Sequence, residues 1–249
     1  MSRNVRTYHH FCMLARALEQ VGDRWTLLVV RDLLGAPRRF TDLMALLGGI
    51  TPKTLAQRLR ELQDAGIVDV DRQPGRREVW YRLTSVGADL APVIESLFLW
   101  GLRHAGRPPL PGEDVHAEHL LSALRIVLDL TPGTRQPLVW QLDFVDAGAY
   151  TLHYEDGGWT LLHGIDQDTS ADVAVTTQTD TWTRFLMTPP DERPADPPGI
   201  DLAGSDDEID RFLQHLARFP YAIPANPASS TATSSSAAWT RAPTVTSSS

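Results

Sequence analysis

The stretch from Thr51 to Gly66 constrains this chain most, because it carries a helix start, a helix stop and two unlike faces. Thr51 can cap the first turn, and Pro52 suits the first helical position because its missing N–H would be unpaired there anyway. Gly66 can adopt the left-handed conformation that ends a helix. On a helical wheel, one face can pack on a core and holds Leu55, Leu59, Leu62 and Gly66. The other face is polar and holds Lys53, Thr54, Gln57, Arg60 and Glu61, with Arg58 on its flank.

This helix has two interpretations. The first is an ordinary amphipathic surface helix whose charged face meets only water. The second depends on its neighbours: a short helix is predicted at 41–47, and a glycine turn at 48–50 joins it to the longer capped helix. A short helix, a tight turn and a longer second helix form the helix-turn-helix arrangement that reads DNA.

After Gly66 the apolar period changes from 3.6 to 2, which predicts a β-hairpin. Its strands lie near 67–70 and 79–83, and the turn between them carries Arg72, Arg76 and Arg77. A hairpin with an arginine-rich tip directly after a recognition helix is a wing, and wing arginines can contact the phosphate backbone or the minor groove. The alternative is a solvated hairpin tip, but the preceding helix pair favours DNA contact.

Three further helices frame this motif. Helical spacing predicts one over 8–21, and Asp23 can cap a second, nearly all-apolar helix over 24–34. A third begins at Thr84 or Ser85 and runs through Leu102, with Pro92 predicting a kink or a late true start. The apolar end of this third helix must be covered. We favour a partner subunit, because DNA-reading modules of this size usually pair; packing within the chain is the alternative.

Charge is segregated along the chain. Residues 1–105 hold 15 Lys and Arg against 11 Asp and Glu, whereas residues 106–224 hold 7 against 20. The first part therefore has a net charge of +4 and the second of −13, which favours a polyanionic partner for the first part only. We expect no membrane span, since no apolar run approaches ~18 residues. We also expect a cytoplasmic location, given the absence of an apolar signal core and the single cysteine.

Several separated motifs together resemble the HxlR-type winged helix-turn-helix regulators, which are relatives of the MarR group. The likeness covers roughly residues 8–103. Each motif is weak alone, but they occur in the right order and spacing. They are Gly22-Asp23-Arg24-Trp25-Thr26-Leu27-Leu28, Arg39-Phe40-x-Asp42-Leu43, Ile50-Thr51-Pro52-Lys53-x-Leu55-x-x-x-Leu59-Arg60-x-Leu62, Gly66-Ile67-Val68 and Val79-x-Tyr81-x-Leu83-Thr84.

The resemblance implies a dimeric transcription factor of the bacterial cytoplasm and nucleoid that binds a pseudo-palindromic operator in double-stranded DNA. Such regulators often repress a nearby operon and release it on a chemical signal. For Arg24 and Trp25 we favour structural roles, in an internal ion pair and as a core anchor. Carried over by position, the DNA contacts would come from Arg38, Arg39, Thr51, Lys53, Thr54, Gln57, Arg58, Arg76 and Arg77.

Cys12 lies where several relatives carry a redox- or quinone-sensing thiol, and it is therefore a candidate redox sensor. Those relatives often read Cys-Pro, whereas this chain reads Cys-Met. A sensing thiol should be exposed and acidified, while most lone cysteines are inert buried residues.

The second half predicts a separate α+β domain with an antiparallel sheet. A Pro/Gly-rich linker over 104–114 precedes it, the domain itself covers 115–224, and a disordered Ser/Thr/Ala/Pro tail covers 225–249. The predicted helices and strands are helices at 115–130, 179–187 and 206–219 and strands at 138–144, 149–154, 159–162 and 172–176.

This domain resembles the sterol-carrier-protein type of lipid-binding fold. The resemblance implies an apolar tunnel and hence a small apolar ligand within 115–224; the alternative is a scaffold with a filled core. The residues that carry it are Tyr150-x-Leu152, Asp156-Gly157-Gly158, Gly164, Ala171-Asp172-Val173-x-Val175-Thr176-Thr177 and Gly199-Ile200-Asp201-Leu202.

The sequence therefore favours a dimeric DNA-binding repressor with an appended ligand-sensing domain. The alternative is a lipid or metabolite carrier whose helical half mediates association. An enzyme is the least favoured class, because the chain has no glycine-rich phosphate loop, GxSxG elbow or HExxH motif. We expect no cofactor and no metal, and we interpret His116 and His119 as solvated helix residues.

Overall fold

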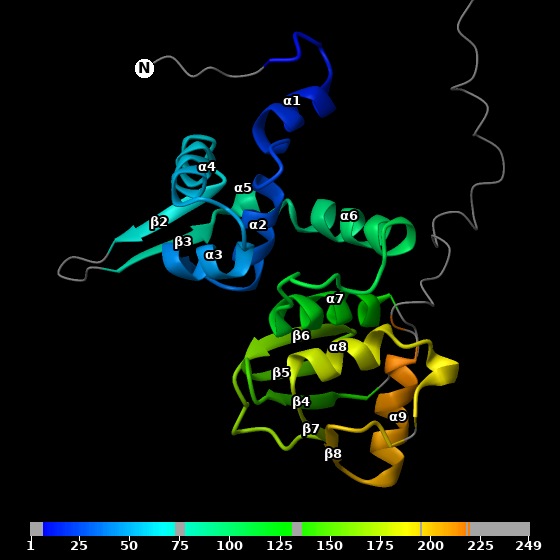
Figure 1. Cartoon of the computed structure of the whole chain (residues 1–249). Helices are drawn as coiled ribbons and strands as arrows, with labels where there is room; N and C mark the ends of the chain where they lie inside the picture. The colour runs from blue at the N-terminus through cyan, green and yellow to red at the C-terminus, as the bar shows by residue number, and fades with distance from the viewer. Residues whose placement is uncertain (1–6, 73–77, 131–135, 195, 218, 220–249) are drawn as a thin grey trace, which may run out of the picture.

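A computed structural model describes residues 7–72, 78–130, 136–194, 196–217 and 219 (Figure 1). The chain forms two units. The N-terminal unit comprises the elements from α1 to α6, and the C-terminal unit those from α7 to α9, with a loop between them.

The N-terminal unit is a helical domain with a small sheet. The three strands are ordered β1-β3-β2 and pair antiparallel, which confirms the predicted hairpin of β2 and β3. The consecutive helices α3 and α4 confirm the predicted helix pair. The two-residue strand β1, which pairs with β3, was not predicted. The elements are α1 (Met13–Val21), α2 (Thr26–Gly35), β1 (Arg38–Arg39), α3 (Phe40–Leu47), α4 (Pro52–Asp64), β2 (Val68–Arg72), β3 (Val79–Leu83), α5 (Ser85–Ala88) and α6 (Ala91–His104).

Helix α4 has the caps and faces expected of it. The Thr51 hydroxyl accepts a hydrogen bond from the Thr54 N–H at 3.2 Å, and Gly66 has a φ of +69°. Such a positive φ is the conformation that glycine alone adopts without strain. The apolar face is buried in the core of the N-terminal unit through Leu55, Leu59 and Leu62.

Helix α1 is shorter than the predicted 8–21, since it begins at Met13. Cys12 is extended, with a φ of −144°, and His9 has a positive φ of 52°, so the backbone before Met13 leaves the helical region.

The predicted break near Pro92 separates α5 from α6. Helix α6 then bridges the two units, because Ile94 packs on the N-terminal core whereas Phe98 and Leu102 pack on the C-terminal core. Among the described residues, the stretch 85–104 is long and apolar enough to cross a membrane, but these two properties alone do not show that it does so. Ile94, Phe98 and Leu102 of this stretch contact the two cores, whereas Leu97 and Trp100 are exposed.

The C-terminal unit is α+β, as predicted, but its sheet is mixed. The strand order is β6-β5-β4-β7-β8, and β4 and β7 run parallel, which corrects the expectation of an antiparallel sheet. The segment after β6 crosses the sheet and returns the chain beside β4. The elements are α7 (Ala117–Asp129), β4 (Leu138–Phe144), β5 (Gly148–Glu155), β6 (Gly158–His163), β7 (Val173–Thr177), α8 (Thr179–Met187), a 3₁₀ turn η1 (Pro190–Glu192), β8 (Ile200–Ala203) and α9 (Asp206–Leu216).

Large aromatic side chains fill the space between this sheet and its helices. Trp140 on β4 contacts Phe212 on α9, with ring centroids 4.9 Å apart, and Trp182 on α8 lies 6.3 Å from the same ring. All three are almost fully buried in one cluster with apolar residues of α7.

The predicted linker over 104–114 begins with the last residue of α6, His104. The remaining residues form an ordered loop. Arg107 donates to Glu113 at 2.8 Å, and the Leu110 N–H donates to the same carboxylate at 2.8 Å. The hydrogen bond from Arg107 lowers the pKa of Glu113 to about 2. This loop therefore holds a defined path along the boundary between the units.

Candidate nucleic-acid interface

The outer face of α4 is open to solvent and lies on the side of the N-terminal unit away from the C-terminal unit (Figure 1). Lys53, Gln57 and Arg60 are exposed along it. The Gln57 amide donates to Glu61 at 3.0 Å, an exposed bond that solvent or a ligand can replace. The face thus presents a cationic and amide-bearing strip about one helix long.

Two predicted contacts at the start of α4 also serve the cap. The hydroxyls of Thr51 and Thr54 lie 2.8 Å apart, while the Thr51 hydroxyl accepts the Thr54 N–H. Both hydroxyls are at the helix N-terminus, where the backbone N–H groups favour anions such as phosphate.

Arg58 is the least free of the predicted contacts on α4. Its guanidinium lies 2.7 Å from Glu61 and 3.5 Å from Asp23, and its side chain is only 20% exposed. The Arg58 Nε is buried without a hydrogen-bond partner among the described residues. In the free protein, Arg58 therefore ties α4 to the turn before α2.

The neighbouring Asp23, and not Arg24, forms the ion pair with Arg58. The internal ion pair that we expected of Arg24 is not found in the described part of the chain. Arg24 is exposed and stacks on Trp25, with its guanidinium carbon 4.8 Å from the ring centroid. Trp25 packs on the N-terminal core, as expected of a core anchor.

Arg39 lies on the surface beside Trp80, towards the tip end of the described hairpin strands, and its side chain is 45% exposed. Its guanidinium lies 3.1 Å from Asp42 and 3.6 Å from Glu78, and it stacks over Trp80 at 5.5 Å. The hydrogen bonds that the Arg39 guanidinium donates to Asp42 raise the pKa of Arg39. Arg39 is thus held in place, with part of its surface open to a ligand.

Arg38 occupies a different place from the one expected of a phosphate contact. Its guanidinium forms an ion pair with Glu118 of α7 and is 14% exposed. Its Nε also donates to the Asp32 carbonyl at 3.3 Å. The structure therefore places Arg38 in the boundary between the two units, because Glu118 of the C-terminal unit covers it.

The wing is described only up to its tip. Arg76 and Arg77 lie outside the described residues. Arg72 ends β2 and is exposed, whereas Arg82 on β3 forms an ion pair with Asp69 at 2.7 Å. The strands of the hairpin lie beside α4 in Figure 1, so the wing and the outer face of α4 belong to one side of the unit.

Sequence reasoning missed a polar cluster at the boundary between the units. Asp32, which is fully buried, accepts from Arg31 at 2.8 Å and pairs with His119 of α7 at 2.9 Å. His163 of β6 lies 3.4 Å from Glu118. His119 is therefore an interface residue, not the solvated one we expected. The available signal was an aspartate within the mostly apolar helix α2, since buried carboxylates need partners.

Burial alone would raise the pKa of Asp32, but hydrogen bonds from His119 and Arg31 outweigh it and lower the pKa. Asp32 is therefore ionised near neutral pH and holds Arg31 by charge and the His119 ring by a hydrogen bond.

Cys12 is exposed and directly precedes α1, so it is not a buried filler. Apolar side chains next to it are exposed as well, including Phe11 at 89% and Leu14 at 68%. Exposed apolar residues on α6, including Leu97 and Trp100, form a second such surface.

Comparison with known proteins yields one matching family model, HxlR-like helix-turn-helix, over residues 20–108. An HTH-type transcriptional regulator of Mycobacterium tuberculosis is 44% identical over 101 residues, which are 39% of this chain and 62% of that protein. The HTH-type transcriptional regulator YkvN of Bacillus subtilis is 34% identical over 98 residues, which are 38% of this chain and 81% of that protein. The chain thus spans less than two thirds of its mycobacterial relative.

Among solved structures, the reduced form of the transcriptional regulator YodB from B. subtilis is 29% identical, with a TM-score of 0.36. It covers 39% of this chain and 100% of that chain. The redox regulator HypR in its oxidized form is 28% identical, with a TM-score of 0.35 over 39% of this chain and 98% of that one.

Proposed function

This chain belongs to the HxlR-like helix-turn-helix family, and on that premise we propose that it is a sequence-specific DNA-binding transcriptional regulator. The observation that carries the proposal is the outer face of α4. This face is solvent-exposed, bears Lys53, Gln57 and Arg60, and lies beside a β-hairpin on the side away from the acidic C-terminal unit.

The chemistry of that face suits the major groove. A glutamine amide can donate to and accept from an adenine edge at once, which makes Gln57 the candidate for direct base readout. Lys53 and the N-terminal N–H groups of α4 suit phosphate, and phosphate contacts set register without carrying sequence information. Thr51 and Thr54 contribute by holding the first turn in place.

Arg39 and Arg58 contribute in different ways. Arg39 lies partly exposed beside Trp80, towards the tip end of the described wing strands, and suits a phosphate contact. Arg58 can reach a guanine only by exchanging Asp23 and Glu61 for the base, so it would be a contact made on binding. Arg76 and Arg77 stay candidates for the wing tip. Arg38 is left out of the proposed interface, because Glu118 holds it.

We propose that the regulator is a homodimer. Two apolar surfaces of the N-terminal unit are uncovered, one on α1 with Phe11 and Leu14 and one on α6 with Leu97 and Trp100. A second copy would bury both and present two α4 helices to a pseudo-palindromic operator, with half-sites about 34–36 Å apart. Repression is the mode we favour, since an operator-bound dimer blocks access to the DNA beneath it.

The C-terminal unit would supply the chemical signal. Its net negative charge disfavours DNA, and we propose that it senses a small apolar metabolite and so releases the operator. The resemblance to sterol-carrier-type domains implies such a ligand, but aromatic side chains fill the core of this unit, so the ligand would bind at its surface and not in an internal tunnel. Cys12 is a second candidate sensor, because its thiol is exposed. The carrier hypothesis differs in one respect: it requires ligand binding without sequence-specific DNA binding.

The test is fluorescence anisotropy with labelled DNA from upstream of the protein's own gene and with a scrambled duplex of equal length. The wild type should prefer the upstream DNA. Gln57→Ala should reduce that preference about 5- to 100-fold, corresponding to about 1–3 kcal/mol for one base contact. Lys53→Ala should weaken binding to both duplexes alike and lower the salt dependence by about one unit of slope.

The matched control is Arg211→Ala on α9, which removes an exposed cation from the C-terminal unit. It should leave both affinities unchanged. Equal binding of the wild type to upstream and scrambled DNA in every fragment tried would refute the regulator and favour the carrier.

A further inference from the structure

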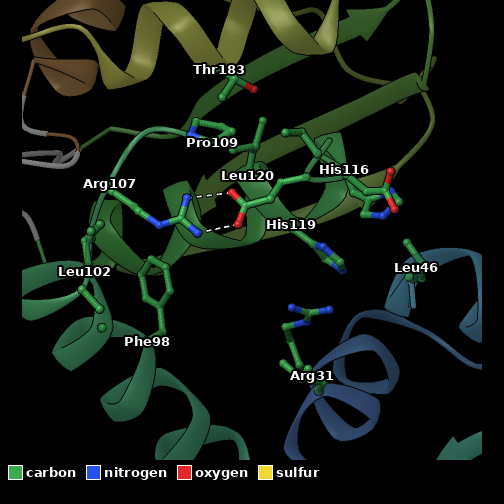
Figure 2. Close-up of a pocket in the computed structure, with 18 of the residues that line it drawn as sticks. Arg31, Leu46, Phe98, Leu102, Arg107, Pro109, His116, His119, Leu120 and Thr183 are labelled. Atoms are coloured by element: carbon green, nitrogen blue, oxygen red, sulfur yellow. Dashed lines mark hydrogen bonds and ion pairs between the residues drawn. The ribbon is translucent and has the colours of Figure 1, made fainter. Parts of the chain in front are cut away.

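A cavity of about 770 Å³ lies between the two units (Figure 2). Helices α2, α3 and α6 line it from the N-terminal unit, while α7, α8 and the loop before α7 line it from the C-terminal unit. Its volume falls in the range of roughly 300–1,000 Å³ that small-molecule sites occupy. Aromatic rings fill the core of the C-terminal unit, whereas this cavity lies at the boundary between the units.

The body of the cavity is apolar. Side chains from every surrounding helix contribute to its wall, namely Leu28, Leu46, Phe98, Leu102, Leu120 and Met187. An apolar ligand placed here would exclude water from this wall, which is the main source of affinity in such sites.

Three nitrogen-bearing side chains gather on the remaining wall. Arg31 and His119 face each other in Figure 2, and both are anchored on the buried Asp32 carboxylate, at 2.8 and 2.9 Å. The His116 ring lies 5.1 Å from that of His119, and its Nε2 is buried without a hydrogen-bond partner in the described part of the chain. A buried nitrogen of this kind needs a partner that a ligand could supply.

The acidic groups near the cavity are already engaged or exposed. Glu113 is paired with Arg107, as the dashed lines in Figure 2 show, and Asp32 is shared between Arg31 and His119. Asp114 lies at the rim and is exposed. The guanidinium of Arg31 is bonded through Nε, which leaves its fork directed at the cavity.

We propose that this cavity binds a small monocarboxylate with an apolar body. The carboxylate would accept hydrogen bonds from Arg31 and His116, and the apolar body would lie against Phe98, Leu102 and Leu120. Arginine suits this task because its planar fork matches a carboxylate. The site spans both units, so its occupant would fix the N-terminal unit relative to the C-terminal unit. We infer that this releases the DNA, an inference that rests on the proposed function.

The test is isothermal titration calorimetry of the full chain with three probes of one chain length: decanoate, 1-decanol and decylamine. The wild type should bind one decanoate per chain and should bind decanol and decylamine at least tenfold more weakly. Arg31→Gln should weaken decanoate binding about tenfold and leave decanol binding unchanged. The matched control, Arg184→Gln, removes an exposed arginine of α8 beside the cavity-lining Thr183 and should leave decanoate binding as it was.

A second variant tests the location without relying on charge. Gly101 lines the cavity from α6, and a Cβ built on it meets nothing within 4 Å. Gly101→Leu should therefore fold, since leucine also favours a helix over glycine, and should fill part of the cavity. It should lower the affinity for decanoate at least tenfold.

Three outcomes would overturn the proposal. The first is no binding of decanoate by the wild type. The second is equal affinity for decanoate and decanol, or an equal loss of decanoate affinity in Arg31→Gln and Arg184→Gln. Either result would show that Arg31 does not recognise the carboxylate. The third is unchanged binding in Gly101→Leu, which would place the probe elsewhere. These titrations contain no DNA, so they test the ligand site independently of DNA binding. A negative result in either experiment therefore does not decide the other.

Discussion

The most informative stability experiment removes the charge of Glu118. Glu118 on α7 forms an ion pair with Arg38 of the N-terminal unit, and the two side chains are only 11% and 14% exposed. Substitution Glu118→Gln keeps the size of the side chain but leaves the Arg38 guanidinium with a half-satisfied set of partners, chiefly the Asp32 carbonyl at 3.3 Å.

The magnitude follows from this geometry. Breaking a buried ion pair by removing one partner costs about 3–5 kcal/mol, because the other charge stays buried. Here the Arg38–Glu118 pair retains some solvent contact, and the amide oxygen introduced at position 118 can still accept one hydrogen bond. We therefore expect Glu118→Gln to lower the free energy of unfolding by about 2 kcal/mol. The double variant with Arg38→Gln should lose about 1–2 kcal/mol less than the sum of the two single losses.

The pH dependence has a definite sign. Burial would raise the pKa of Glu118, but the hydrogen bond from His163 and the charge of Arg38 outweigh it and lower the pKa below its ordinary 4.5. A carboxyl group with a lowered folded-state pKa stabilises the protein above its unfolded-state pKa, and this stabilisation is lost as the pH falls through the folded-state value. The difference in the free energy of unfolding between wild type and Glu118→Gln should thus have its full value at pH 7. It should shrink as the pH falls below the ordinary pKa of a glutamate.

The assay is urea unfolding followed by tryptophan fluorescence at pH 7 and at several acidic values. If the two single losses simply add in the double variant, and each is below about 0.5 kcal/mol, the ion pair between the units does not form in solution. The placement of Arg38 at the boundary would then be wrong.

Two further variants test other parts of the structure. Thr51→Ala removes the side-chain cap of α4 and should lower the free energy of unfolding by about 1 kcal/mol in the same urea assay; no loss would mean that the cap is not formed. Leu97→Glu places a charge on the exposed apolar surface of α6 and should shift the protein from dimer to monomer in sedimentation velocity. A dimer that persists unchanged in Leu97→Glu would exclude that surface from the interface.

Local signals made the N-terminal unit predictable. The caps and faces of α4 depend on residues within one helix, and the hairpin depends on a period of two, so each can be read from neighbouring residues. The break at Pro92 is similarly local, since proline lacks the N–H and suits the start of α6.

Pairings between residues far apart in the sequence could not be predicted from local signals. The parallel pairing of β4 with β7 joins strands separated by a hairpin and a crossing segment, and no local period encodes it. Arg38 pairs with Glu118, eighty residues further along the chain, and Arg58 pairs with Asp23 in the turn between α1 and α2. In the sequence each arginine looked free to contact DNA, because its partner becomes a neighbour only in the folded chain.

The measurement that tests the regulator most directly is site-specific crosslinking from α4 to DNA. Cys12 is the sole cysteine of the sequence, so Cys12→Ser gives a cysteine-free background. A photo-crosslinker attached at Gln57→Cys on α4 should crosslink to bases of the upstream DNA, whereas the same label at Arg211→Cys on α9 should not. Crosslinking from α9 that equals or exceeds crosslinking from α4 would contradict DNA recognition by the outer face of α4.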